Sequence, residues 1–294
     1  MIERIDIDRL TLRYGDVTAL DGLSLSLEGG KIYGLLGRNG SGKTSLLSVI
    51  AAFRKPTSGD VRINGQPVFE NQAITSQIAF IRESGDTVED TEKVESAMRY
   101  AAYLRPNWDA EYAARLLERF EVPTKARIGS LSRGKRSALG IVLGLAARAP
   151  LTIFDETYLG MDAPSRYAFY DELLNDYMAH PRTFIISTHL IEEVSRLFEN
   201  VVIIDRGRLV VHDDVETLLD RGTAVTGPAD VVDRFVNGYT VIGTRQLGRT
   251  KSAMVYGHLD PEQRAEARAA GLDLEPLALQ DLFVHLTEPR GDQS

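Results

Sequence analysis

The stretch Gly37-Arg38-Asn39-Gly40-Ser41-Gly42-Lys43-Thr44 matches the pattern G-x-x-x-x-G-K-[ST] at every fixed position. Residues 31–36, before it, predict a short buried strand, and residues 45–52, after it, predict a helix. Glycines at this spacing let successive backbone N–H groups point inward, and the positive end of a helix adds to their attraction for an anion. The stretch therefore predicts a phosphate-binding loop, because a plain glycine-rich turn would not require Lys-Thr after a strand.

Two side chains of this loop carry the expected chemistry. Lys43 would reach the β- and γ-phosphates of a bound nucleotide, and the Thr44 hydroxyl would coordinate Mg²⁺. The residues expected to contact the nucleotide here are Gly37, Arg38, Asn39, Gly40, Ser41, Gly42, Lys43, Thr44 and Ser45.

The composition narrows the class of protein. The chain has 294 residues, 43% of them hydrophobic, a formal net charge of −8 and no cysteine. It can form one large domain or two modest ones, and the lack of cysteine excludes disulfides and thiolate sites and favours a reducing, cytoplasmic compartment. The charged start does not resemble a signal peptide, and no apolar run approaches the roughly 18 residues of a membrane span. The acidic balance gives no reason to expect nucleic acid as a partner.

The order of patterns along the chain predicts an α/β fold. Residues 5–27 alternate apolar and polar positions, which indicates an antiparallel β region with one wet face, and Asn64-Gly65 predicts a hairpin turn. Between about residues 90 and 150 the periodicity becomes helical, and we interpret this part as a helical insert. Its first clear helical face consists of Ala113, Leu116, Leu117 and Phe120.

Two further buried strands end in polar side chains. Residues 151–156 end in Asp155-Glu156, and residues 184–189 end in His189. In a mostly parallel sheet such groups gather at the carboxyl ends of the strands. Asp155 would hold the Mg²⁺ that Thr44 touches, and Glu156 would polarise an attacking water. Two acids in solvent and a purely structural histidine are the alternatives. The helix between these strands is expected to bury Tyr170, Leu173, Leu174 and Tyr177.

Beyond about residue 221 the pattern restarts in the order βαββαβ, which suggests a small ferredoxin-like unit. The expected strands and helices are 223–226, 229–235, 240–244, 252–256, 261–269, 272–276 and 279–286. We therefore expect two domains, residues 1–219 with a helical subdomain at about 84–150, and a small C-terminal α+β domain at 220–294.

This order of motifs resembles the ATP-binding cassette (ABC) family, the ATPase subunits of ABC transporters, over about residues 5–214. Arg13-Tyr14-Gly15 resembles the family's aromatic loop, in which Tyr14 would stack on the adenine of ATP. Leu131-Ser132-Arg133-Gly134-Lys135-Arg136 resembles the LSGGQ signature, in which Ser132 and the backbone at Gly134 would bind the γ-phosphate held by a second subunit.

Two further features follow from the same resemblance. Gly160-Met161-Asp162 resembles the loop after the catalytic Glu156, with Asp162 contacting the partner subunit, and His189 resembles the switch histidine that contacts the γ-phosphate. Glu83 stands where the family usually has a coupling-loop Gln, and its carboxylate would still ligate Mg²⁺ or a lytic water, with weaker nucleotide binding.

The signature also departs from the family pattern. Arg133 replaces its second glycine and Lys135 replaces its Gln, and both cations could favour a phosphate. The segment 279–287 resembles the last helix of bacterial drug-export and bacteriocin-export ATPase subunits, with a helix docking on its own domain as the alternative.

The resemblance implies a P-loop NTPase of ABC type, with a mostly parallel sheet, an antiparallel β subdomain and a helical insert. It implies an enzyme that hydrolyses ATP with Mg²⁺, lies on the inner face of the cell membrane and energises a separate transmembrane permease, with export favoured. A second ATPase subunit, in a homodimer or a heterodimer, would complete each site. The alternative is a soluble or regulatory ABC-type ATPase that is not coupled to transport.

Overall fold

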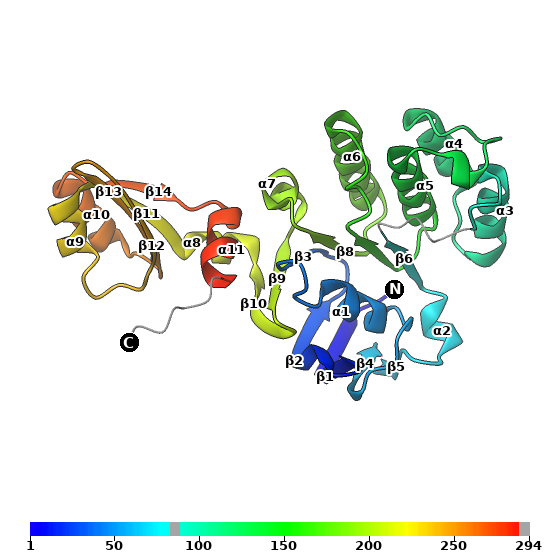
Figure 1. The fold of residues 1–294 in the computed structure, drawn as a ribbon, viewed down its shortest axis with the longest axis horizontal. Helices are drawn as coiled ribbons and strands as arrows, with labels where there is room; N and C mark the ends of the chain where they lie inside the picture. Colours follow the sequence, from blue (N-terminus) through cyan, green and yellow to red (C-terminus); the bar gives the residue numbers. More distant parts are fainter. Residues whose placement is uncertain (83–88, 288–294) are drawn as a thin grey trace. The chain divides into compact units, whose positions relative to one another are not determined.

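The computed structural model describes residues 1–82 and 89–287. The chain forms two compact units, which Figure 1 draws and which are described separately below. The first unit comprises Met1–His189 and Ile204–Leu209, and the second comprises Leu190–Ile203 and Val210–Ser294. The division between them runs through strands β9 and β10 and does not test the domain boundary expected after residue 219, which stays a prediction.

The antiparallel β region of the first unit is confirmed. Its sheet has the order β2-β1-β4-β5, with β1 Arg4–Tyr14, β2 Val17–Glu28, β4 Ser58–Ile63 and β5 Gln66–Pro67. Alternate side chains of β1 and β2, such as Ile5 and Leu27, are buried, because one face of this sheet lies on the core. The Asn64-Gly65 turn has the positive φ angles of 51° and 74° that a tight hairpin requires.

The second sheet has the order β10-β9-β3-β8-β7-β6 and is parallel from β3 through β6. Its strands are β3 Ile32–Leu36, β6 Ile78–Arg82, β7 Leu151–Asp155, β8 Thr183–Thr188, β9 Asn200–Asp205 and β10 Arg208–Asp214. Strands β3, β7 and β8 are buried along their whole length, because helices cover both faces of the sheet. Figure 1 shows α1 (Lys43–Ile50) on one face and α5 (Arg133–Ala146) and α6 (Ala163–Ala179) on the other. This sheet is the mostly parallel one expected.

Helices between β6 and β7 form the expected insert. They are α3 Val94–Leu104, α4 Ala110–Arg119, the 3₁₀ turn Ile128–Ser130 and α5 Arg133–Ala146, with the short α2 Gln72–Thr75 before β6. Asp109 caps α4 by accepting a hydrogen bond from the Tyr112 N–H at 2.9 Å. The predicted face of α4 is buried, and α5 is buried from Ser137 to Ala146, so the helical reading of this region is confirmed.

Helix α6 (Ala163–Ala179) buries a face that overlaps the predicted one, with the predicted Leu174 and Tyr177 only half-buried. Tyr170 and Leu173 are buried as expected, but the other buried positions are Phe169 and Asp176. Phe169 packs edge-on against Phe154, with ring centroids 5.2 Å apart. The buried face is therefore set by the partners of the helix, an aromatic cluster and two arginines, and not by its apolar positions alone.

The second unit contains the ferredoxin-like arrangement. The strands β11 Gly222–Pro228, β12 Val241–Leu247, β13 Thr250–Tyr256 and β14 Asp273–Pro276 form an antiparallel sheet in the order β12-β13-β11-β14. The helices of this unit are α7 Ile191–Val194, α8 Val215–Asp220, α9 Ala229–Phe235, α10 Pro261–Ala269 and α11 Leu279–Thr287, with a 3₁₀ turn at Ser195–Leu197. The βαββαβ order is the one predicted from the sequence.

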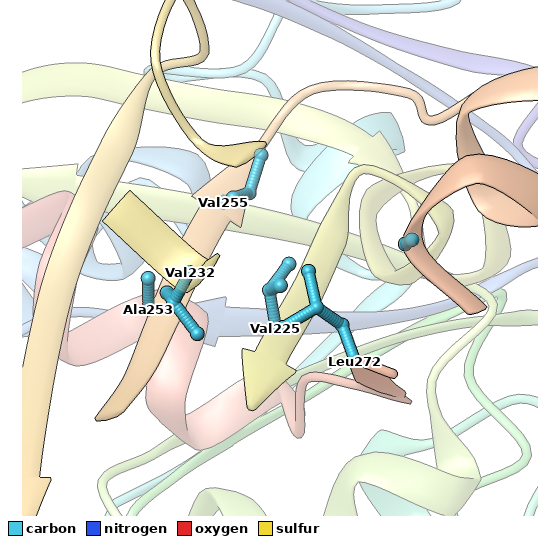
Figure 2. Packing of buried hydrophobic residues seen from close by; sticks show 6 residues of the cluster. Val225, Val232, Ala253, Val255 and Leu272 are labelled. Atoms are coloured by element: carbon cyan, nitrogen blue, oxygen red, sulfur yellow. The ribbon is translucent and has the colours of Figure 1, made fainter. Parts of the chain in front are cut away.

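The core of the second unit lies between its antiparallel sheet and its helices. Figure 2 shows Val225 of β11 and Ala253 and Val255 of β13 with Val232 of α9 and Leu272, which precedes β14. Each of these side chains is at most 3% exposed. Branched side chains on alternate strand positions thus close one face of the sheet.

In the part of the chain that the structure describes, no helix is both long enough and apolar enough to cross a membrane.

Candidate active site

The predicted phosphate loop connects β3 to α1. Gly40 and Gly42 have φ angles of 79° and 104°, which residues other than glycine rarely adopt. A Cβ atom at Gly42 would lie 2.6 Å from the Ala19 carbonyl oxygen, so this position also has no room for a side chain. Around these glycines, Arg38, Asn39 and Thr44 are exposed, while Gly37, Ser41 and Lys43 are buried.

Lys43 and Ser41 point their polar groups into this loop. Lys43 is 6% exposed, and its ammonium group donates to the Gly37 carbonyl oxygen at 2.8 Å and lies 3.4 Å from Glu156 Oε1. The Ser41 hydroxyl is buried and has no hydrogen-bond partner among the residues that the structure describes. A buried ammonium bound to carbonyl groups of its own loop, beside an unsatisfied hydroxyl, is a donor set suited to phosphate oxygens.

Asp155 ends β7 and lies against the start of α1. It is 4% exposed, and burial raises the pKa of its carboxyl group, while hydrogen bonds from the Ser187 and Thr44 hydroxyls oppose that rise. The structure thus brings together Thr44 and Asp155, the two predicted Mg²⁺ ligands that it describes. Glu83, the third, lies outside the described residues.

Glu156 connects the phosphate loop to His189. Its backbone has a φ angle of 51°, which is uncommon for a residue other than glycine and is often found at functional sites. One carboxylate oxygen lies 3.4 Å from Lys43 Nζ, and the other lies 3.5 Å from His189 Nδ1. The strand ends therefore place the expected water-polarising carboxylate beside the expected phosphate ligands.

These residues fit ATP and Mg²⁺. No cluster of three or more His, Cys, Asp and Glu side chains placed to hold a metal ion occurs within residues 1–82 and 89–287. A site with one carboxylate and one hydroxyl suits Mg²⁺ that takes its remaining ligands from phosphate oxygens and water. Lys43, the loop N–H groups and Ser41 would hold the phosphates.

Tyr14 lies at the edge of this site. Its hydroxyl is 3.5 Å from Ser45 Oγ at the start of α1, its side chain is 42% exposed, and the Arg54 guanidinium lies 5.6 Å from the ring centre. An exposed aromatic ring beside the phosphate loop is available for stacking on a base.

The signature residues lie at helix starts. Ser132 caps α5 by accepting from the Lys135 N–H at 3.3 Å, and Asp162 caps α6 by accepting from the Ser165 N–H at 2.9 Å. A Cβ atom at Gly134 would lie 2.9 Å from the Gly160 carbonyl oxygen, so these two helix starts pack closely. Within the described residues, the side-chain hydrogen bonds of Ser132 and Asp162 do not reach the phosphate loop of the same chain.

Ser187 was missed by the sequence analysis. Its hydroxyl donates to Asp155 Oδ1, and the parallel register of β7 and β8 sets the two residues side by side. The only signal in the sequence was a hydroxyl residue two positions before His189, and its meaning depends on knowing that register.

Comparisons with known proteins agree with this geometry. The ABC transporter family model matches residues 20–158. The Nod factor export ATP-binding protein I of Burkholderia orbicola is 29% identical over 96% of each chain, and the ABC transporter ATP-binding protein YtrB of Bacillus subtilis is 25% identical over 97% of this chain and 96% of its own. A solved structure of an ATP-binding subunit of an ABC transporter has a TM-score of 0.65 and 24% identity, and the match covers 74% of this chain and 92% of that one. These similarities support the interpretation of this chain as an ATPase subunit of an ABC transporter.

Proposed function

We propose that ATP hydrolysis by this chain drives export through a separate membrane-spanning permease. ATP hydrolysis is supported by one observation, the contacts of the Glu156 carboxylate with Lys43 and with His189 beyond the ends of β3, β7 and β8. Export is supported by the Burkholderia relative, which is named for export and is similar over 96% of both chains, including the C-terminal region.

The residues at the strand ends divide the chemistry between them. Lys43 and the loop N–H groups bind the β- and γ-phosphates, and Thr44 and Asp155 would hold Mg²⁺, which would supply positive charge to offset the negative charge of the phosphates. Glu156 exchanges its pairing with Lys43 for a hydrogen bond from the attacking water. It orients that water toward the γ-phosphorus, while His189 fixes the orientation of the Glu156 carboxylate.

A second cassette subunit supplies the signature. Ser132 and the backbone at Gly134 lie at the amino end of α5, where exposed donors and the helix dipole attract a phosphate. In a head-to-tail dimer these groups bind the γ-phosphate of the partner's nucleotide, and Asp162 contacts the partner. A homodimer is the arrangement we propose, and a heterodimer with another cassette chain is the competing result.

A docking face for the permease is supported by exposed apolar side chains of the first unit. Tyr103 and Leu104 of α3 are 88% and 67% exposed, and Phe53, which packs on Phe80, is 63% exposed. Adjacent exposed apolar side chains such as Tyr103 and Leu104 are typical of interaction surfaces, whereas single exposed apolar residues are ordinary. We place the chain on the inner face of the cell membrane, with residues 1–219 as the cassette domain and 220–294 as an accessory domain.

The first test is whether a neighbouring reading frame encodes a polytopic membrane protein, and the second is co-expression of this chain with that protein. We expect the chain to co-purify with that protein and to hydrolyse ATP faster in the complex, and the Tyr103→Ser/Leu104→Ser variant to lose both effects. Val17→Ser, on the exposed part of β2, is the control. A chain that hydrolyses ATP equally well alone, and that no such membrane protein retains, would instead be an uncoupled ATPase.

A further inference from the structure

Ser187 contacts both carboxylate residues at the end of β7. Its hydroxyl donates to Asp155 Oδ1, and its backbone carbonyl oxygen accepts the Glu156 N–H at 3.3 Å. The side chain is fully buried, and β8 carries it directly beside Asp155 in the parallel register. One residue therefore touches the expected metal ligand and the expected water-positioning residue through different atoms.

The hydroxyl contact restricts the Asp155 carboxylate. A carboxylate on a single Cβ–Cγ bond rotates, and a metal ion that binds one of its oxygens requires a defined orientation. Hydrogen-bond partners of metal ligands supply that orientation and typically change metal affinity by about 10- to 100-fold. A donor on Oδ1 leaves the other oxygen of Asp155 to face the metal.

The carbonyl contact acts on the backbone of the next residue. Glu156 has a φ angle of 51°, a conformation that costs free energy for a residue with a side chain. Its N–H bond to Ser187 favours this conformation, in which the carboxylate lies between Lys43 and His189. Substituting the Ser187 side chain removes the hydroxyl contact and keeps the carbonyl contact.

We propose that Ser187 is a positioning residue whose hydroxyl orients Asp155 for Mg²⁺ and whose carbonyl holds Glu156 in place. The inference rests on the proposed roles of Thr44 and Asp155 as Mg²⁺ ligands. It assigns the hydroxyl to metal binding and not to binding of the nucleotide itself.

The test compares Ser187→Ala and Ser187→Cys with Thr152→Ala. Cysteine is larger than serine and its thiol is only a weak hydrogen-bond donor, so it carries the test if the alanine variant does not fold. Thr152 is the matched control, because it is a fully buried hydroxyl residue on the neighbouring β7 whose hydroxyl donates to the Ala149 carbonyl oxygen, at 3.5 Å. Calorimetry measures ATP affinity in EDTA, and electron paramagnetic resonance measures Mn²⁺ binding in the presence of a non-hydrolysable ATP analogue.

Both Ser187 variants should bind ATP in EDTA as the wild type does and bind Mn²⁺ about 10- to 100-fold more weakly, while Thr152→Ala keeps wild-type metal affinity. Unchanged Mn²⁺ affinity in both variants, or an equal loss in Thr152→Ala, would overturn the inference. Wild-type protein that binds ATP but gains no Mn²⁺ site would overturn the proposed metal ligands, and wild-type protein that binds no ATP would overturn the proposed function itself.

Discussion

Asp176→Asn should strongly destabilise the first unit, because Asp176 is the buried partner of two arginines. Its side chain is 2% exposed and pairs with Arg148 and with Arg182, the latter at 2.5 Å. Arg148 also reaches Asp109 at 3.1 Å, but that carboxylate is 35% exposed. Burial, followed by the charge of Arg148, lowers the pKa of Arg182 to about 10, so the guanidinium group of Arg182 remains charged at pH 7.

The expected loss of stability follows from the positive charges that Asp176→Asn leaves without a buried counterion. Removing one partner of a buried ion pair costs about 3–5 kcal/mol, since the remaining charge has no buried counterion. For a unit of this size each kcal/mol lowers Tm by about 2–4 °C, which gives a fall of about 6–20 °C. Asp176 lies on α6 and pairs with Arg182, which directly precedes β8, whereas the site lies at the carboxyl end of that strand, so Asp176→Asn should leave ATP affinity below Tm unchanged.

The assay is thermal and urea unfolding followed by circular dichroism, with Asp171→Asn as the control. Asp171 lies on the exposed side of the same helix, so its substitution should change stability by less than about 0.5 kcal/mol. Adding Arg182→Met to Asp176→Asn removes one unpaired charge and should restore part of the loss. A cost below about 1 kcal/mol for Asp176→Asn, or no recovery in the double variant, would refute this reasoning.

Three predictions concern the nucleotide site. Lys43→Ala should abolish MgATP binding, because it removes the ammonium that faces the phosphates, and calorimetric titration with wild-type affinity would contradict this. Glu156→Gln should bind ATP, lose most turnover and accumulate as an ATP-bound dimer in gel filtration, whereas normal phosphate release would exclude its role. Lys43→Ala mixed with Ser132→Arg, each inactive alone, should regain roughly a quarter of wild-type turnover through random pairing, and no recovery would argue against a shared homodimeric site.

Local patterns predicted most of the fold. The alternation in residues 5–27, the buried strands and the helical periodicity of α4 each depend on neighbours in the sequence, and the same holds for the βαββαβ order of the second unit. The phosphate loop was identifiable because its chemistry lies in eight consecutive residues. Asp155, Glu156 and His189 could be placed together because parallel strands end on one edge of a sheet.

Features that depend on pairs distant in the sequence were not predictable in this way. Asp176 can be buried because it pairs with Arg148 and Arg182, which lie outside α6 in the sequence. The periodicity of α6 alone predicted Leu174 and Tyr177 as buried positions and did not predict Asp176. The role of the Ser187 hydroxyl likewise depends on the register of β7 against β8. A polar side chain at a buried position is therefore assigned correctly only after its partner is known.

The altered signature shows the same dependence on partners. The sequence allowed Lys135 to favour a phosphate, but in this structure its ammonium donates to the Phe120 carbonyl oxygen at 2.8 Å and lies 3.2 Å from Glu121 Oε2, at the end of α4. Using Lys135 on a partner's nucleotide would require breaking both contacts. Within residues 1–82 and 89–287, the hydroxyl of Ser132 has no such competing long-range hydrogen bond, because it accepts from the Lys135 N–H and so caps its own helix. Recognition of the second nucleotide in the proposed dimer therefore depends on the hydroxyl and the helix amino end, with Lys135 joining α4 to α5.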